Sequence, residues 1–173
     1  MRAIAAEAGV TAMALYNYAP SKAALFESVW QESIEAIYTD YEAAVAGRGS
    51  LLEEVDALLD RSREVLVDNP DHTRFVVRLL LEREHVGLAA ADLQVHAAAN
   101  FFGQLAERSV RRGEINKRDR DRLATFITTL LWGITTVTAF DADSLDRSIE
   151  AAKWASRRQL HSMTSHPPSA RTG

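Results

Sequence analysis

The sequence predicts an all-α protein, and three features of its pattern support this fold class. Apolar residues recur at spacings of three and four along most of the 173 residues, which is the period of an amphipathic helix. Glycine, proline and asparagine divide this pattern into segments of helical length. We find no run of alternating apolar and polar residues, which would be typical of a half-buried strand. We therefore expect a short helical N-terminal unit, a long connecting helix and a set of further helices.

Caps and breaks give the expected order of these helices. The capping box from Ser50 to Glu53 opens one helix, Asn69 and Pro70 open the next, and Gly87 ends that one. We expect helices over residues 21–46, 50–68, 70–86, 89–110, 123–140 and 145–161. The chain then divides into a head with its linker helix at 1–46, a larger helical domain at 47–162 and a disordered tail at 163–173.

The composition is that of a soluble globular chain, with 47% hydrophobic residues, 25% charged residues and a formal net charge of −4. The sequence contains no cysteine, which excludes disulfides, thiol catalysis and cysteine-ligated zinc. We see no apolar run near the roughly 18 residues that span a bilayer, and no signal sequence at the N-terminus. These features favour a cytoplasmic protein that does not bind membranes.

The first 22 residues have the pattern of a helix-turn-helix. Ala5 is small enough for two helices to cross closely, Gly9 can take the positive φ of the turn, and Thr11 can cap the second helix. Spacing alone leaves an alternative open, because any two short helices around a glycine give a similar pattern. The inner faces of the two helices would meet at Ile4, Ala8, Val10, Leu15 and Tyr18.

The string IAAEAGVTAMALYNYAPSKAALF, from Ile4 to Phe26, resembles the second and third helices of the TetR family of bacterial transcriptional regulators. The match runs almost without gaps and is fairly specific. The sequence RRGEI at Arg111–Ile115 and two final apolar helices are similar, more loosely, to the family's ligand-binding and dimerisation domain. The resemblance implies a DNA-binding head at 1–46 and an effector-binding and dimerisation domain at 47–162. It also implies a ligand-responsive repressor that a small apolar or amphipathic effector releases from a palindromic operator.

The same resemblance implies roles for residues of the head on double-stranded DNA. Arg2, Glu7 and Lys22 are the charged residues among the first 22 and leave a local net charge of +1. The reading helix contains no arginine, which disfavours bidentate guanine recognition and leaves Asn17 as the best candidate to hydrogen-bond a base. Base edges would face Thr11, Ala12, Met13 and Asn17, and the DNA backbone would contact Tyr16, Tyr18 and Lys22.

The sequence departs from the family pattern at two points. Ala19 stands where the family usually has phenylalanine, which reduces an anchor between the head and the linker helix. The family's first helix, which covers the apolar backs of the other two, has no counterpart before Ile4. We therefore expect either a start codon further upstream or a poorly folded head. The alternative function is a helical dimeric sensor or interaction module that no longer binds DNA.

The helix over 123–140 carries Trp132 among threonines, a mixture that suits a small-molecule cavity between helices. For each of these side chains, simple packing in the core is the alternative. The residues expected around an effector are Phe75, Leu79, Asn100, Phe102, Phe126, Thr129, Trp132 and Thr136.

Small residues on the last helix would let a second helix approach closely. The last two helices of two copies could then form a four-helix bundle across a twofold axis. A last helix that lies on its own domain is the alternative. The residues expected at this homodimer interface are Leu130, Ile134, Val137, Ile149, Ala152, Ser156 and Leu160.

Catalytic chemistry has little support in the sequence. Glu82 and His85 have the spacing of a di-iron helix, but we find no second copy of that motif. Phosphate loops and nucleophile motifs are absent from the sequence. The arginines and lysine between Arg108 and Arg122 alternate with acidic residues, which indicates a solvated helix end. We therefore expect no enzyme activity, no cofactor and no metal site.

Overall fold

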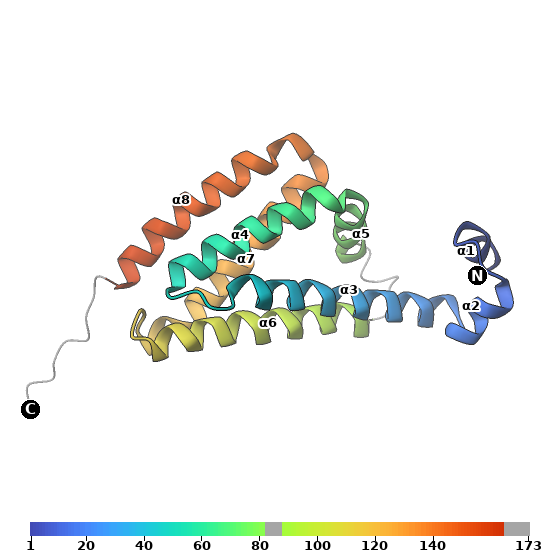
Figure 1. The fold of residues 1–173 in the computed structure, drawn as a ribbon, viewed down its shortest axis with the longest axis horizontal. Helices are drawn as coiled ribbons and strands as arrows, with labels where there is room; N and C mark the ends of the chain where they lie inside the picture. The colour runs from blue at the N-terminus through green and yellow to red at the C-terminus, as the bar shows by residue number, and fades with distance from the viewer. Residues whose placement is uncertain (82–87, 165–173) are drawn as a thin grey trace, which may run out of the picture.

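Two short helices and one long helix form the N-terminal part of the molecule. The computed structural model describes residues 1–81 and 88–164, with side chains for residues 1–77 and 96–163. Helices α1 (Arg2–Glu7) and α2 (Ala12–Tyr18) lie together at one end of the molecule (Figure 1). Helix α3 (Lys22–Val45) runs from this head into the body.

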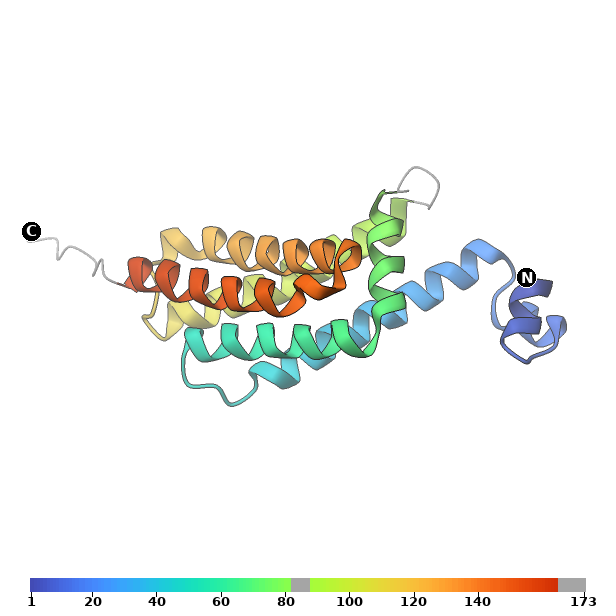
Figure 2. The same cartoon turned by 90° about the horizontal axis from the view of Figure 1, so that it is seen from above.

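The body of the described chain is a bundle of helices with one short helix across its end (Figures 1 and 2). Short 3-10 turns, η1 (Lys117–Asp119) and η2 (Ala142–Ser144), lead into the last two helices. The α-helices of the body are α4 (Leu51–Asp68), α5 (Pro70–Leu81), α6 (Leu88–Arg111), α7 (Arg120–Phe140) and α8 (Leu145–Thr164).

The core of the body lies where α4, α6 and α7 meet, and α8 covers one side of it. Leu58, Leu105 and Leu123 are almost completely buried there, one from each of the three central helices. A smaller cluster of Trp30, Ile34 and Val76 joins α3 to α5. The all-α prediction is confirmed, since each regular element in the described ranges is a helix.

The helix ends follow local chemistry. Ser50 caps α4 by accepting a hydrogen bond from the backbone N–H of Glu53, at 3.3 Å. The carboxylate of Glu53 accepts from the backbone N–H of Gly49 at 2.8 Å, one residue earlier than a standard capping box predicts. Helix α8 continues to Thr164 and Met163 is buried, so the packed chain extends past the expected boundary at residue 162.

A buried carboxylate connects α4 to the end of α6. The side chain of Glu54 is 3% exposed and accepts from both terminal nitrogens of Arg112, at 3.2 and 2.5 Å. Arg108 lies 3.5 Å from the same carboxylate. Glu114, held by Arg112, accepts from the backbone N–H of Leu51 and so caps α4 from a distant part of the chain. Arg108 and Arg112 therefore have internal acidic partners, whereas the sequence predicted only a solvated helix end.

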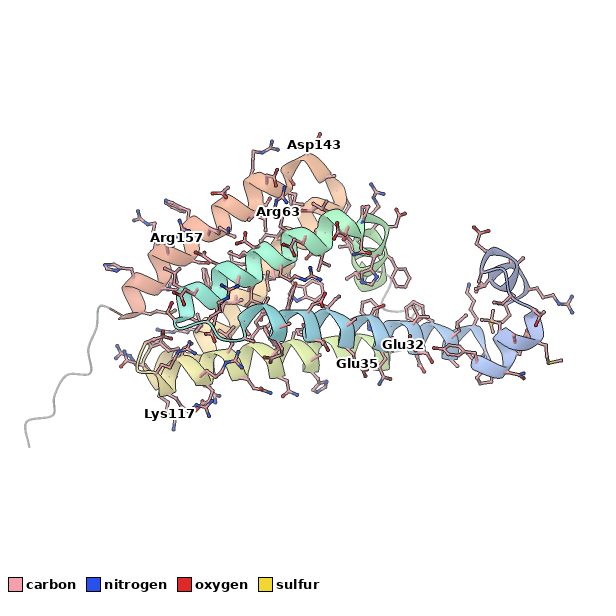
Figure 3. All side chains as sticks on the ribbon, viewed as in Figure 1. Glu32, Glu35, Arg63, Lys117, Asp143 and Arg157 are labelled. Atoms are coloured by element: carbon pink, nitrogen blue, oxygen red, sulfur yellow. The ribbon has the colours of Figure 1, made fainter. Side chains whose placement is uncertain are left out.

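Ion pairs fix α8 antiparallel on α4. Arg157 pairs with Asp56 at 3.1 Å and Lys153 pairs with Asp60 at 2.5 Å. Further along, Arg63 pairs with Asp146 at 2.7 Å. Arg63 and Arg157 lie on these two neighbouring helices in Figure 3. These contacts set the face of α8 that packs on the core of its own chain.

The expectation that no apolar run is long enough to span a bilayer is wrong for helix α7. Within the described residues, the segment Lys117–Phe140 is long and apolar enough to cross a membrane by length and composition. Our expectation missed it because threonines interrupt the run without adding charge. In the structure, Leu123, Ile127, Leu131 and Ile134 of this helix are buried in the body, as in a core helix of a globular domain.

Candidate DNA-binding head and ligand cavity

The head is a helix-turn-helix with a small inner face. Gly9 takes a positive φ of 67° between α1 and α2, as the turn requires. Ala5, Leu15 and Ala19 are buried, whereas Val10 and Tyr18 of the expected inner face are exposed. The small side chain of Ala19 is only 1% exposed, so the position of the family's phenylalanine is an internal one here.

The predicted DNA-facing residues lie on or next to the exposed surface of α2. Thr11 caps the helix by accepting from the backbone N–H of Ala14 at 3.1 Å. Met13 is 70% exposed, Tyr16 and Asn17 are also exposed, and Ala12 is half-buried. Lys22 is exposed at the first position of α3, where Ser21 accepts from the backbone N–H of Ala24.

Tyr18 has a different environment from the other predicted contacts. Its hydroxyl donates to the carboxylate of Glu32 on α3 at 2.6 Å, and this hydrogen bond is the main reason that the pKa of Tyr18 is raised. Glu32 lies on the stretch of α3 between the head and the body (Figure 3). In this conformation Tyr18 therefore links α2 to the linker helix.

A cavity lies inside the body, between α3, α4, α5, α6 and α7. Its free space is about 80 Å3, which is small beside the roughly 300–1,000 Å3 of typical ligand pockets. Hydrocarbon side chains from all five helices form most of the wall. The polar side chains that line it are Tyr38, Tyr41, Ser62, His72, Thr73 and Thr135.

The structure brings two of the eight predicted effector residues, Phe102 and Trp132, to this cavity. Phe75 lies beside it on α5, 38% exposed, with its ring centroid 5.6 Å from that of Phe26 and 6.2 Å from that of Trp30. The side chain of Leu79 lies outside the described part.

The other four predicted residues lie elsewhere. Asn100 is exposed beside a groove between α3 and α6, and Phe126 packs against the main core. Thr129 and Thr136 are exposed on the outer face of α7. The face of the helix that points to the cavity contains Thr135 instead of Thr136.

Sequence reasoning missed the polar residues of the cavity. Tyr38 and Tyr41 lie on α3, which we treated as a linker with a plain apolar stripe. Burial raises the pKa of both hydroxyls and lowers the pKa of His72, so all three side chains are neutral near pH 7. The available signal was the spacing of the two tyrosines with Ile34, which places them on one face of a helix.

Histidine, aspartate and glutamate side chains are spread over the described chain. Within it, no group of three or more histidine, aspartate or glutamate side chains could hold a metal ion. The motif containing Glu82 and His85 lies outside the described residues.

Comparison with known proteins agrees with the geometry of the head. Residues 1–29 match the family described as "Bacterial regulatory proteins, tetR family". This range contains both helices of the head and the start of α3. It therefore includes the exposed surface of α2 and the turn glycine between α1 and α2.

The chain therefore resembles the tetR family in its first 29 residues. It is 25% identical over 132 residues to the nucleoid occlusion factor SlmA of Mannheimia succiniciproducens, a match that covers 75% of this chain. The chain aligns with 61% of the length of that relative.

The stripe predicted at a dimer interface lies mostly within the protomer. Ile149, Ala152 and Leu160 are buried in the main core, as is Ile134 of α7. Ser156 is 0% exposed. The correction has a simple cause: the small residues of α8 allow a close approach, and α4 of the same chain makes that approach, aligned by its ion pairs with α8.

The opposite side of α7 and α8 is exposed and apolar. Val137, Phe140 and Trp154 are 47%, 76% and 63% exposed. A shallow groove runs between the two helices, which lie side by side in Figure 2. Its lining includes four predicted interface residues, Leu130, Ile134, Val137 and Ala152, together with Thr129, Gly133, Ser148, Ala151, Trp154 and Ala155.

Proposed function

We propose that this chain is a cytoplasmic transcriptional repressor that binds a palindromic DNA operator as a homodimer. A small apolar or amphipathic effector in the cavity of the body would release it. The observation that carries this proposal is the continuity of α3, which begins beside the head at Lys22 and supplies Ile34, Tyr38 and Tyr41 to the cavity wall. One helix therefore connects the surface proposed to meet DNA with the site proposed to meet the effector.

The proposed DNA contacts divide by chemistry. The amide of Asn17 can make a bidentate hydrogen bond with an adenine, and Ala12 and Met13 suit the methyl groups of thymine. Tyr16 and Lys22 can contact phosphates, which fix the position of the head without reading sequence. Tyr18 could join them only after leaving Glu32, whose negative charge also repels phosphate. Affinity should therefore depend strongly on salt, because phosphate contacts release counterions.

Helix α5 would carry the response to the effector. Thr73 and Val76 of α5 line the cavity, and Phe75 on the same helix touches the rings of Phe26 and Trp30 on α3. A ligand larger than the present free space must push a wall outward, and α5 is the short helix at the end of the bundle (Figure 2). Movement of α5 would displace α3 through the contacts of Phe75 with the rings of α3. This displacement would change the relative populations of the positions that the head can take.

The exposed face of α7 and α8 is the proposed dimer surface. Gly133, Ala151 and Ala155 in its groove are small enough for a second copy to approach closely, while Phe140 and Trp154 supply apolar area. A twofold dimer would present two heads to half-sites about one helical turn, or 34–36 Å, apart.

Fluorescence anisotropy of a labelled duplex from the protein's own upstream intergenic region tests this function. We expect saturable binding that is tighter than to a scrambled duplex and that weakens steeply between two salt concentrations. A dimer that binds neither duplex would contradict the proposal and would favour the helical sensor that does not bind DNA.

A further inference from the structure

Hydroxyl groups in the cavity are committed as donors within the protein. Ser62 donates to the backbone carbonyl of Leu58 at 2.7 Å, and Thr73 donates to that of Asn69 at 3.1 Å. Thr135 donates to a carbonyl of its own helix in the same way, at 2.9 Å. A hydroxyl has a single proton, so each of these oxygens can offer a ligand only its lone pairs.

The single proton of Tyr41 is also used within the protein. Its hydroxyl oxygen lies 2.9 Å from the hydroxyl oxygen of Ser62. Because the proton of Ser62 is already used on the carbonyl of Leu58, Tyr41 must be the donor of this bond. The hydroxyl pair of Tyr41 and Ser62 thus faces the cavity as an acceptor. Donors to a ligand can come from Tyr38, Trp132 and one ring nitrogen of neutral His72.

The rest of the cavity wall disfavours the binding of a charged ligand. Phe102, Trp132, Val76 and their neighbours give the cavity an aromatic and aliphatic lining. Among the lining residues that the structure describes there is no carboxylate, lysine or arginine. An ion entering this site would lose its water without gaining a charged partner, which is strongly unfavourable.

We propose that the cavity binds an uncharged aromatic molecule carrying a hydroxyl or N–H group, and that the Tyr41–Ser62 hydroxyl pair accepts a hydrogen bond from that group. This inference rests on the proposed function, because it assigns a chemical class to the effector of the same site. The free space of about 80 Å3 is below the roughly 150 Å3 of a cavity that binds benzene, so even a single ring with a short substituent requires an outward movement of α5.

Matched ligands test the assignment by titration calorimetry. The probes are 4-ethylphenol, its methyl ether 4-ethylanisole, which lacks the donor, and the ions 4-ethylbenzoate and 4-ethylbenzylammonium. We expect the phenol to bind about tenfold more tightly than the ether, the size of one modest hydrogen bond. Both ions should bind at least about a hundredfold more weakly than the phenol, because neither finds a charged partner.

The variant Ser62→Ala gives the sharpest result. Removing the serine frees the proton of Tyr41, so this hydroxyl can donate to the oxygen of the ether while its own lone pairs remain. The preference for phenol over ether should then become smaller. Ser33→Ala is the control: Ser33 donates in the same manner to the carbonyl of Val29, at 2.8 Å, but lies outside the cavity. This control should keep the preference for phenol.

Several results would overturn the assignment: no binding of the phenol, equal or tighter binding of the ether or an ion, or an unchanged preference in Ser62→Ala. Operator binding by the ligand-free protein is measured separately by anisotropy. If an ion binds and releases the operator, the ligand class is wrong but the proposed regulation stands. If the phenol binds as expected but the ligand-free protein does not bind DNA, the regulation fails and the ligand class stands.

Discussion

The dimer surface gives the most quantitative prediction, and Trp154 is the residue at which to test it. This side chain is 63% exposed on the outer face of α8, where its ring is covered only in part, by Arg158 at 5.2 Å. We expect the substitution Trp154→Glu to leave the fold intact, because the side chain is largely outside the core, and to separate the protomers.

The magnitude follows from the exposed area. A large aromatic residue buries up to about 250 Å2, so the exposed 63% of Trp154 corresponds to about 160 Å2. At about 25 cal/mol per Å2, covering this area would stabilise the dimer by about 4 kcal/mol per copy. A twofold interface contains the residue twice. If about half of the exposed area of each ring is covered, we expect a loss of about 4 kcal/mol per dimer, or roughly a thousandfold increase in Kd.

Sedimentation equilibrium over a series of protein concentrations measures this change. The control is Val29→Glu, which places the same charge at a 46% exposed apolar residue of α3, a helix outside the proposed interface. The control should dimerise like the wild type. A Trp154→Glu protein that is folded by circular dichroism and still dimerises with unchanged Kd would refute the placement of the interface on α7 and α8.

Other predictions concern stability and coupling. Glu54→Gln should lower the free energy of unfolding in urea by about 3 kcal/mol, because it removes one partner of a buried ion pair, whereas exposed Glu150→Gln should change it by less than about 0.5 kcal/mol. Phe75→Ala should keep the affinity for the cavity ligand but weaken its effect on operator binding, compared by calorimetry and anisotropy. Since burial lowers the folded-state pKa of His72, the unfolded chain protonates first; thermal stability should fall as the pH drops through about 6.5, and His72→Asn should flatten that dependence.

The helices could be predicted because their signals are local. Gly9 and the caps at Thr11 and Ser50 act within three or four residues of their own position, and the structure confirms each of them. The helical spacing of apolar residues then predicts that the segments between these points are helices. The residues of the turn and of α2 also matched a family pattern, which is why the head could be recognised from sequence.

The orientation of the helices could not be predicted in the same way. Helix α7 carries apolar or hydroxyl residues on every side, so nothing in its own sequence distinguishes Thr135, at the cavity, from Thr136, on the surface. For α8, the stripe with Ile149 and Ser156 would suit either a partner copy or the same chain. Burial of Ile149 in the core of its own chain decides between them, and the accompanying ion pairs, such as Lys153 with Asp60, join residues far apart in sequence.

DNA recognition by the head is the central claim, and a comparison of Asn17→Ala with Lys22→Ala tests it most directly. Anisotropy would be measured on the specific and the scrambled duplex across a salt series. We predict that Asn17→Ala loses most of the discrimination between the duplexes and retains its salt dependence. Lys22→Ala should weaken binding to both duplexes alike and reduce the salt slope by about 1.8, because the dimer loses one phosphate contact in each head. Wild-type protein that binds both duplexes equally, or an Asn17→Ala protein that discriminates as well as the wild type, would contradict this account.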